Sequence, residues 1–255
     1  MPFSTTGMKR TKWIMGMPIT VVVLDEAADE DALQEVFEYF AYVDQTFSTY
    51  KVDSEISKIN RKEIEKKDWG EDMKTVFDLA DKTKKETGGY FDIVTPEKTF
   101  DPSGLVKGWA IYNAAEILAK KGYKNFYVNA GGDIEARGKN KDGKNWSVGI
   151  RNPFANDRNN IVKTVFISDR GLATSGTYER GQHIYNPRTG RAPLLDISSI
   201  TVIGPNVFEA DRFATAAFAM GKDGINFIEQ LSGFEGYTID ANGIATMTSG
   251  FEKYC

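Results

Sequence analysis

Three long segments of the chain place apolar residues three and four positions apart, which is the spacing of an amphipathic helix. The segments are residues 29–48, 71–89 and 104–123. Their apolar positions are Leu33, Val36, Phe37, Phe40 and Val43, then Met73, Val76, Phe77 and Ala80, then Val106, Ala110, Ile117 and Leu118. Gly88 and Gly89 lie at the end of the second segment and Gly122 near the end of the third, and glycine is the usual residue just past a helix end. The pattern therefore predicts three helices in the first half of the chain.

β-branched apolar runs predict strands elsewhere. Residues 17–26 form one such run, and four more, broken by Gly, Asn and Pro, follow residue 123. These four are residues 124–139, 145–153, 160–169 and 197–206. Residues 207–221 and 224–233 return to a helical pattern, and residues 236–248 predict a hairpin that turns at Asn242-Gly243. Helices followed by runs of strands favour an α+β fold, and with no evident linker we expect one domain over residues 1–255.

Composition excludes several function classes. The 255 residues carry a formal net charge of −4, so neither nucleic acid nor an anionic membrane is an expected partner. The one cysteine, Cys255, permits no intrachain disulfide and no cysteine-based metal site. The first twenty residues hold no apolar run long enough for a signal peptide or transmembrane segment. We expect a cytoplasmic protein, or an exported one if a leader precedes Met1.

Asp211 and Thr215 lie four residues apart in the helix predicted over 207–221, so both side chains share one helix face. A carboxylate and a hydroxyl are hard oxygen ligands, which suit Mg²⁺ because that ion takes few protein ligands. The alternative is structural: Asp211 caps a helix or pairs with a cation, and Thr215 packs. Spacing alone leaves both readings open.

Other segments hold groups that suit a ligand, each with a structural alternative. Tyr90 and Phe91 follow a glycine pair and are suited to a planar ring, or to the core. Asp101 precedes a predicted helix start, whose free N–H groups and the nearby Lys107 favour an anion. "NAGGDI" adds a glycine-rich loop with one acid, Asp133. None of these segments forms a GxGxxG or a GxxxxGK[ST] motif, so Rossmann and P-loop folds are not predicted.

His183 is the one histidine of the chain. It lies between "TSGTYERG" and "NPRTG", away from any GxSxG motif, so Ser175 in "TSG" is not predicted to be a nucleophile. Histidine is the side chain whose ordinary pKa lies nearest neutrality, which makes it a natural proton carrier. A hydrogen-bonded structural role is the alternative.

The order of these segments is more specific than any one of them. "IMGMPI", "FSTYKVDSEISKIN", "GGYFDIV", "DPSGLVKGWAI", "VNAGGDI", "ATSGTYERGQHIYNPRTGRAP" and "ITVIGPNVFEADRFATAAFAMG" follow one another along residues 13–221. In this order the chain resembles the ApbE family, the FAD:protein FMN transferases. The resemblance implies an α+β fold of the ApbE type, with a mostly antiparallel sheet and packed helices.

The resemblance also implies site residues. The residues that match the family's FAD contacts are Met15, Tyr50, Tyr90, Phe91, Asp92, Asp101, Lys107 and Tyr185, the last through its backbone. Asp211 and Thr215 match its Mg²⁺ ligands, and Gly104 matches the position that gives a backbone carbonyl to the metal. His183 matches the histidine of the family's "H-I-x-x-P-x-T-G" segment. Ala214 is a departure, because some relatives carry an acid there.

The implied activity is Mg²⁺-dependent cleavage of the FAD pyrophosphate. The FMN part passes to a Thr or Ser hydroxyl of an acceptor flavoprotein, and AMP leaves. Asp211 would hold the metal, and His183 is our candidate base for the hydroxyl proton, since phosphoryl transfer needs charge neutralisation and positioning. Two alternatives stay open on the sequence alone: an FAD pyrophosphatase that gives FMN and AMP, and a protein that binds FAD without turnover.

Overall fold

A computed structural model describes residues 7–157, 159–176, 186–190 and 196–255 of the chain. Across these residues the main sheet has eight strands in the order β1-β2-β3-β4-β7-β8-β9-β10, and every neighbouring pair is antiparallel. β5 and β6 form a separate two-stranded antiparallel hairpin. The fold is α+β with an antiparallel sheet, as predicted.

The strands of the main sheet are β1 (Met8–Ile14), β2 (Met17–Val23), β3 (Phe126–Ala130), β4 (Asp133–Arg137), β7 (Arg170–Gly176), β8 (Ile197–Gly204), β9 (Glu235–Asp240) and β10 (Ala245–Met247). The hairpin consists of β5 (Trp146–Arg151) and β6 (Ile161–Ile167). The helices are α1 (Glu30–Phe47), α2 (Glu55–Asn60), α3 (Glu71–Glu86), α4 (Ser103–Lys120), α5 (Val207–Ala219) and α6 (Gly224–Glu229).

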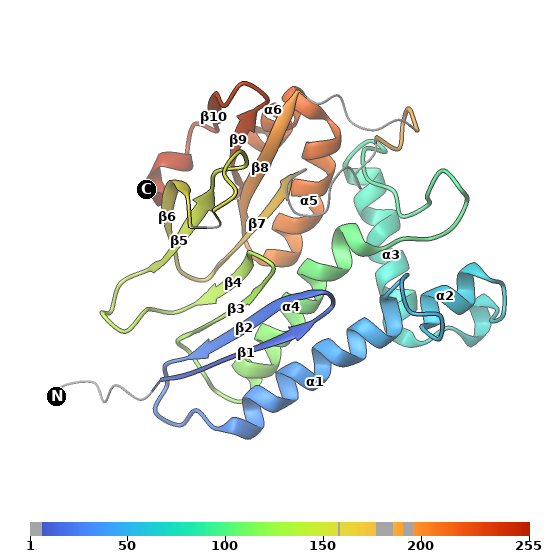
Figure 1. Cartoon of the computed structure of the whole chain (residues 1–255), viewed down its shortest axis with the longest axis horizontal. Coiled ribbons are helices and arrows are strands. Elements are labelled where there is room, and N and C mark those ends of the chain that lie inside the picture. Colours follow the sequence, from blue (N-terminus) through green and yellow to red (C-terminus); the bar gives the residue numbers. More distant parts are fainter. Residues whose placement is uncertain (1–6, 158, 177–185, 191–195) are drawn as a thin grey trace.

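The long helices gather on one face of the sheet (Figure 1). α4 contacts β3 and β4, α5 contacts β7 and β8, and the two helices contact each other. The apolar faces predicted for α1, α3 and α4 enter one core with β2 and β3, and that core contains Leu33, Phe40, Met73 and Val106. A second core joins α5 and α6 to β7 and β8.

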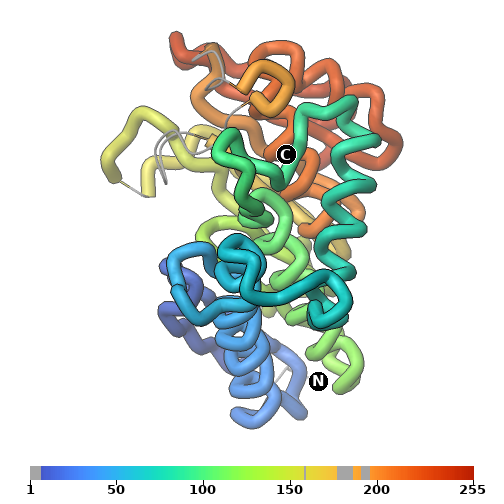
Figure 2. Tube along the Cα trace, turned by 90° about the vertical axis from the view of Figure 1, so that its right-hand side faces the viewer, coloured from blue at the N-terminus to red at the C-terminus, as the bar shows by residue number. Residues whose placement is uncertain are grey.

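The opposite face of the sheet is covered by the β5–β6 hairpin and the C-terminal 3-10 turn, Phe251–Tyr254. Residues of the same strand divide between the two faces: Val21 and Val23 pack under the helices, and Val22 packs on the hairpin side. This alternation is the period of two that a strand imposes on its side chains. Figure 2 shows the yellow hairpin and the teal α3 on opposite sides of the molecule.

Most predicted elements are present, with ends shifted by a few residues. Two strands were not predicted, β1 and β7. β1 is the edge of the sheet, and its sequence MKRTKWI has side chains that are mostly exposed, so it carries no apolar pattern. β7 reads RGLATSG, which is rich in small residues. No helix in the described part of the chain has the length and apolarity that crossing a membrane requires.

Candidate functional site

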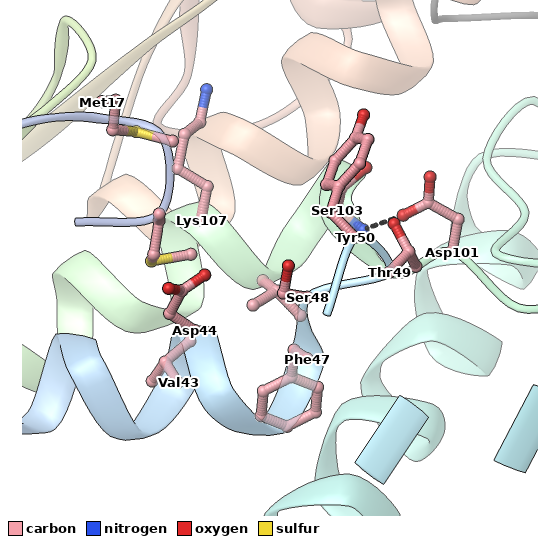
Figure 3. A pocket seen from close by; sticks show the side chains of 12 residues that line it. Met17, Val43, Asp44, Phe47, Ser48, Thr49, Tyr50, Asp101, Ser103 and Lys107 are labelled. Atoms are coloured by element: carbon pink, nitrogen blue, oxygen red, sulfur yellow. Dashed lines mark hydrogen bonds between the residues drawn. The ribbon is translucent and has the colours of Figure 1, made fainter. Parts of the chain in front are cut away.

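A pocket opens where the β1–β2 turn, the end of α1 and the start of α4 meet (Figure 3). Its lining includes four of the predicted FAD contacts, Met15, Tyr50, Asp101 and Lys107. The enclosed volume is about 70 Å³. Ligand sites usually measure about 300–1,000 Å³, so these residues enclose only part of the surface that a dinucleotide needs.

Met15 reaches the pocket from a tight turn. Met15 and Gly16 have φ angles of 56° and 71°, and they connect Ile14 to its pairing partner Met17. Two positive φ values are the mark of a type I′ hairpin turn, whose twist suits the flanking strands. A long side chain costs free energy in this conformation, and such positions concentrate at functional sites.

Tyr50 and Asp101 both line the pocket, Tyr50 from the turn after α1 and Asp101 from the segment before α4 (Figure 3). The Tyr50 side chain lies in the turn after α1 and is 93% exposed, so little of the protein surrounds its ring. Asp101 Oδ1 accepts a hydrogen bond from the Ser103 backbone N–H at 3.0 Å, which satisfies one free donor at the start of α4. The Asp101 carboxylate thus holds the start of α4, and the exposed Tyr50 ring is a surface that a flat ligand can cover.

α4 and α5 approach closely where the predicted metal residues lie. The Thr215 hydroxyl donates a hydrogen bond to the Gly104 carbonyl oxygen at 3.0 Å. A Cβ at Gly104 would lie 3.1 Å from Thr215 Cγ2 and 3.1 Å from Phe91 Cε2. The absence of a side chain at Gly104 therefore lets a backbone carbonyl of one helix reach a hydroxyl of the other.

The Asp211 side chain contacts α4 at Gly108, one helical turn beyond Gly104. Its Oδ2 accepts a hydrogen bond from the Gly108 backbone N–H at 2.7 Å, and the residue is 2% exposed. Burial raises the pKa of Asp211 to about 7; the Lys107 ammonium opposes this rise and the Asp133 carboxylate adds to it. A bound cation would favour the charged form, so metal binding here would release protons.

These oxygens fit Mg²⁺. Neighbouring ligands of an octahedral Mg²⁺ ion, each about 2.1 Å from the metal, lie roughly 3 Å apart. The 3.0 Å between Thr215 Oγ1 and the Gly104 oxygen matches that separation, and the hydroxyl proton can rotate away. Asp211 adds a carboxylate from the same face of α5. No group of three or more His, Cys, Asp or Glu side chains arranged for a metal occurs among the residues described, so carbonyl and hydroxyl ligands would have to complete this site.

Lys107 lines the pocket and also lies beside the oxygen cluster, by which we mean the Asp211 carboxylate, the Thr215 hydroxyl and the Gly104 carbonyl. Its side chain lines the pocket, and its Nζ lies 3.6 Å from Asp211 Oδ1 and 2.6 Å from Asp133 Oδ2. Figure 3 shows it rising from α4 beside Met17, away from Phe47. An anionic ligand entering the pocket would therefore meet this ammonium next to the oxygen cluster.

Two residues of this arrangement were not predicted as parts of the site, Asp133 and Gly108. Asp133, 1% exposed, begins β4 directly after the tight β3–β4 turn. In the sequence it is one acid in a glycine-rich loop, and only the pairing of β4 in the sheet brings it to α4. Gly108 could have been predicted from the sequence, because Gly104 and Gly108 repeat the four-residue spacing of Asp211 and Thr215.

Tyr90, Phe91 and Asp92 lie outside the lining of the pocket. Phe91 is 3% exposed and belongs to the core beneath α4. The Asp92 carboxylate pairs with the Lys84 ammonium at 2.6 Å. The Tyr90 ring lies 4.9 Å from the Arg188 guanidinium carbon, so the "GGYFD" and "NPRTG" segments meet there. Contact of these three residues with FAD stays a prediction.

His183 and Tyr185 lie outside the described residues, and their predicted roles are carried by the sequence alone. Asn186, the next residue toward the C-terminus, is described. Its backbone oxygen accepts a hydrogen bond from Gly190 at 2.8 Å, which closes the turn that holds Arg188. The contact of Arg188 with Tyr90 therefore places residues 186–190 beside the turn that follows α3.

Comparison with known proteins shows which family the chain is similar to. Residues 15–99 and 94–238 match the ApbE family. A FAD:protein FMN transferase from Haemophilus influenzae is 30% identical over 168 residues, which make up 62% of this chain and 49% of that protein. The chain thus spans about half the length of the curated relatives it matches.

Solved structures share the fold. The flavin transferase ApbE from Vibrio cholerae superposes with a TM-score of 0.85 at 22% identity, covering 99% of this chain and 100% of that one. The ApbE protein from Thermotoga maritima gives 0.86 at 20% identity, over 98% and 99% of the two chains. The matched residues include the α4 and α5 segments that build the oxygen cluster and the turn that carries Met15. The sequence match and the common fold together establish that the chain belongs to the ApbE family.

Proposed function

We propose that the protein transfers FMN from FAD to a Thr or Ser hydroxyl of an acceptor flavoprotein, with Mg²⁺ as the required ion and AMP as the second product. The observation that carries this proposal is the position of Lys107. It lines the pocket and lies beside the Asp211 carboxylate, so the pocket proposed for the flavin adjoins the oxygens proposed for the metal. Support comes also from the relatives, which are named FAD:protein FMN transferases.

Asp211, the Thr215 hydroxyl and the Gly104 carbonyl would hold the Mg²⁺ ion. When bound, the ion supplies positive charge that stabilises the pyrophosphate during its cleavage. Lys107 adds a second positive charge from the pocket side. Both act by positioning and by charge, which is most of what phosphoryl transfer requires of a protein.

The reaction breaks the bond between the FMN phosphorus and the bridging oxygen of the pyrophosphate. The acceptor oxygen forms a new bond to that phosphorus, its proton passes to a base, and the bridging oxygen leaves with AMP. His183 is the proposed base, because its ordinary pKa lies near neutrality.

The flavin end of FAD would lie in the pocket of Figure 3. Met15 and Tyr50 would contact the ring system, and Asp101 would accept hydrogen bonds from a polar edge. The other residues that the family resemblance assigns to contact with FAD are Tyr90, Phe91, Asp92, Lys107 and, through its backbone, Tyr185.

An incubation with FAD, Mg²⁺ and an acceptor protein tests this proposal, with products separated by chromatography. FMN attached to the acceptor and an equal amount of AMP are the expected products. Free FMN with AMP would instead identify a pyrophosphatase, and intact FAD would identify a protein that only binds it. Substitution Asp211→Ala should abolish the Mg²⁺-dependent activity, and an activity with unaltered Mg²⁺ dependence would remove Asp211 from the metal site.

Two further expectations stay predictions. A single domain over residues 1–255 should resist limited proteolysis as one fragment, since strands from Met8 to Met247 share the main sheet. The cytoplasmic location expected from the sequence is tested by fractionating cells that express the full gene.

A further inference from the structure

Asp133 is a buried carboxylate to which the proposed reaction gives no task. Its side chain is 2% exposed, and its Oδ1 accepts a hydrogen bond from the Thr174 backbone N–H of β7 at 3.0 Å. Because β4 and β7 are neighbours in the sheet, this bond fixes the orientation of the carboxylate. The second oxygen is thereby aimed at α4, where the Lys107 ammonium lies 2.6 Å away.

The ammonium is shared unequally between two carboxylates. Lys107 Nζ is 2.6 Å from Asp133 Oδ2 and 3.6 Å from Asp211 Oδ1. The first distance is that of a close ion pair, and the second is that of a looser one, too long for a hydrogen bond. Asp211 Oδ2 is occupied by the Gly108 N–H, so Oδ1 is the oxygen through which Asp211 would bind a cation. A close ion pair between Lys107 and Oδ1 would compete with that cation.

We propose that Asp133 is a positioning residue that holds the Lys107 ammonium away from Asp211, so that Asp211 Oδ1 stays available to the divalent cation. This inference rests on the proposed metal site at Asp211. It assigns to Asp133 the task of keeping two positive charges, an ammonium and a metal ion, beside one another in a small volume. Without Asp133 the nearest carboxylate for Lys107 would be Asp211.

Alternatively, Asp133 acts through its charge alone, as any buried anion near a cation would. The two explanations differ in additivity. A simple charge effect weakens cation binding by the same factor whether Lys107 is present or absent. The positioning role makes the effect of losing Asp133 depend on Lys107, because without the ammonium there is nothing to hold back.

The test is a double-mutant cycle on cation affinity without FAD, measured by Mn²⁺ electron paramagnetic resonance. Wild type, Asp133→Asn, Lys107→Met and the double variant are compared. Asn keeps an oxygen for the Thr174 N–H, and Asp133→Ser replaces it if the Asn variant does not fold, as judged by thermal unfolding. We expect Asp133→Asn to weaken Mn²⁺ binding by about 10- to 100-fold in the presence of Lys107. In the Lys107→Met background the same change should cost less than about threefold.

Equal factors in the two backgrounds would overturn the positioning role. So would an Asp133→Asn variant that binds Mn²⁺ as tightly as wild type. The Asp211→Asn variant separates this result from failure of the proposed metal site. If Asp211→Asn binds Mn²⁺ like wild type, the metal site itself is wrong and the role of Asp133 falls with it. If Asp211→Asn loses Mn²⁺, the cycle decides on Asp133 alone.

Discussion

The Gly108 backbone N–H donates a 2.7 Å hydrogen bond to Asp211 Oδ2, so the path of α4 fixes the carboxylate of α5. This contact requires glycine, because a Cβ at position 108 would lie 2.6 Å from Asp211 Cβ and 2.9 Å from the Val207 carbonyl oxygen. The packing of the two helices and the orientation of the proposed metal ligand therefore depend on the same contact.

Gly108→Ala should therefore destabilise the protein. Alanine gains about 1 kcal/mol of helix propensity over glycine, but overpacking costs about 1–3 kcal/mol and here involves backbone that cannot move aside. We expect a net loss of about 1–2 kcal/mol in the free energy of unfolding, measured with urea. Gly104→Ala is the control and should lose less, because its neighbours at 3.1 Å are side-chain atoms of Phe91 and Thr215. Stability equal to wild type at position 108 would contradict this reading.

Arg212 ties α5 to α3, and its loss should also destabilise the fold. Its side chain is 4% exposed, pairs with Glu86 and Glu209, and lies 3.9 Å from the centre of the Phe213 ring. Removing one partner of a buried ion pair costs about 3–5 kcal/mol, but the 38% exposure of Glu86 reduces this figure. We expect Arg212→Met to lose about 2 kcal/mol in urea unfolding.

Lys82→Met is the matched control for Arg212, since Lys82 pairs with the same Glu86 at 3.8 Å from an exposed position on α3. Its loss should change the free energy of unfolding by less than about 0.5 kcal/mol. Equal effects of the two substitutions would show that burial of Arg212 does not matter.

Loss of the Tyr50 ring should weaken FAD binding and leave the stability of the fold unchanged. Its side chain is 93% exposed and lines the pocket, so truncation removes a ring contact with the ligand and almost none with the protein. We expect Tyr50→Ala to weaken FAD binding by about 5- to 30-fold, equivalent to about 1–2 kcal/mol, in a flavin fluorescence titration. Val52→Ala, at a 70% exposed position outside the pocket lining, should leave FAD affinity unchanged. Loss of affinity in both variants, or in neither, would argue against flavin contact at Tyr50.

The long helices α1, α3 and α4 were predictable from sequence because their apolar spacing is regular over four or more turns, whereas the short α2 was not predicted. The faces of α1 and α3 enter the core at Leu33, Phe40 and Met73, as the spacing predicts. β1 was missed for the opposite reason. Its side chains are mostly exposed, and pairing with β2 through the Met15–Gly16 turn, rather than burial, holds it in the sheet.

The site residues also divide into those that the sequence predicts and those that it does not. The i, i+4 spacing of Asp211 and Thr215 correctly predicted that both side chains lie on one face of α5, where Asp211 contacts Gly108 and Thr215 contacts Gly104. Asp133 could not be assigned in this way, because its task depends on a strand pairing that brings residue 133 to residue 107. The sequence around Asp133, a glycine-rich loop with one acid, does not indicate that Lys107 is its neighbour.

His183→Ala should lower FMN transfer by about 10²- to 10⁴-fold at saturating FAD and Mg²⁺, which is the usual contribution of a general base. FAD affinity should stay near that of wild type, since the proposed task of the imidazole is to take the acceptor proton. Single-turnover rates and fluorescence titration measure the two quantities separately. An unchanged transfer rate would remove His183 from proton transfer, and a rate loss matched by lost FAD affinity would make it a binding residue.

The central claim is tested most directly by the intact mass of an acceptor flavoprotein after incubation with the protein, FAD and Mg²⁺. We predict a gain of one FMN group, joined through its phosphate, and an equal amount of AMP. The gain should disappear with a metal chelator, with Asp211→Asn, or when the acceptor Thr or Ser is replaced by Ala. An acceptor of unchanged mass, with FAD either intact or converted to free FMN, would contradict the account.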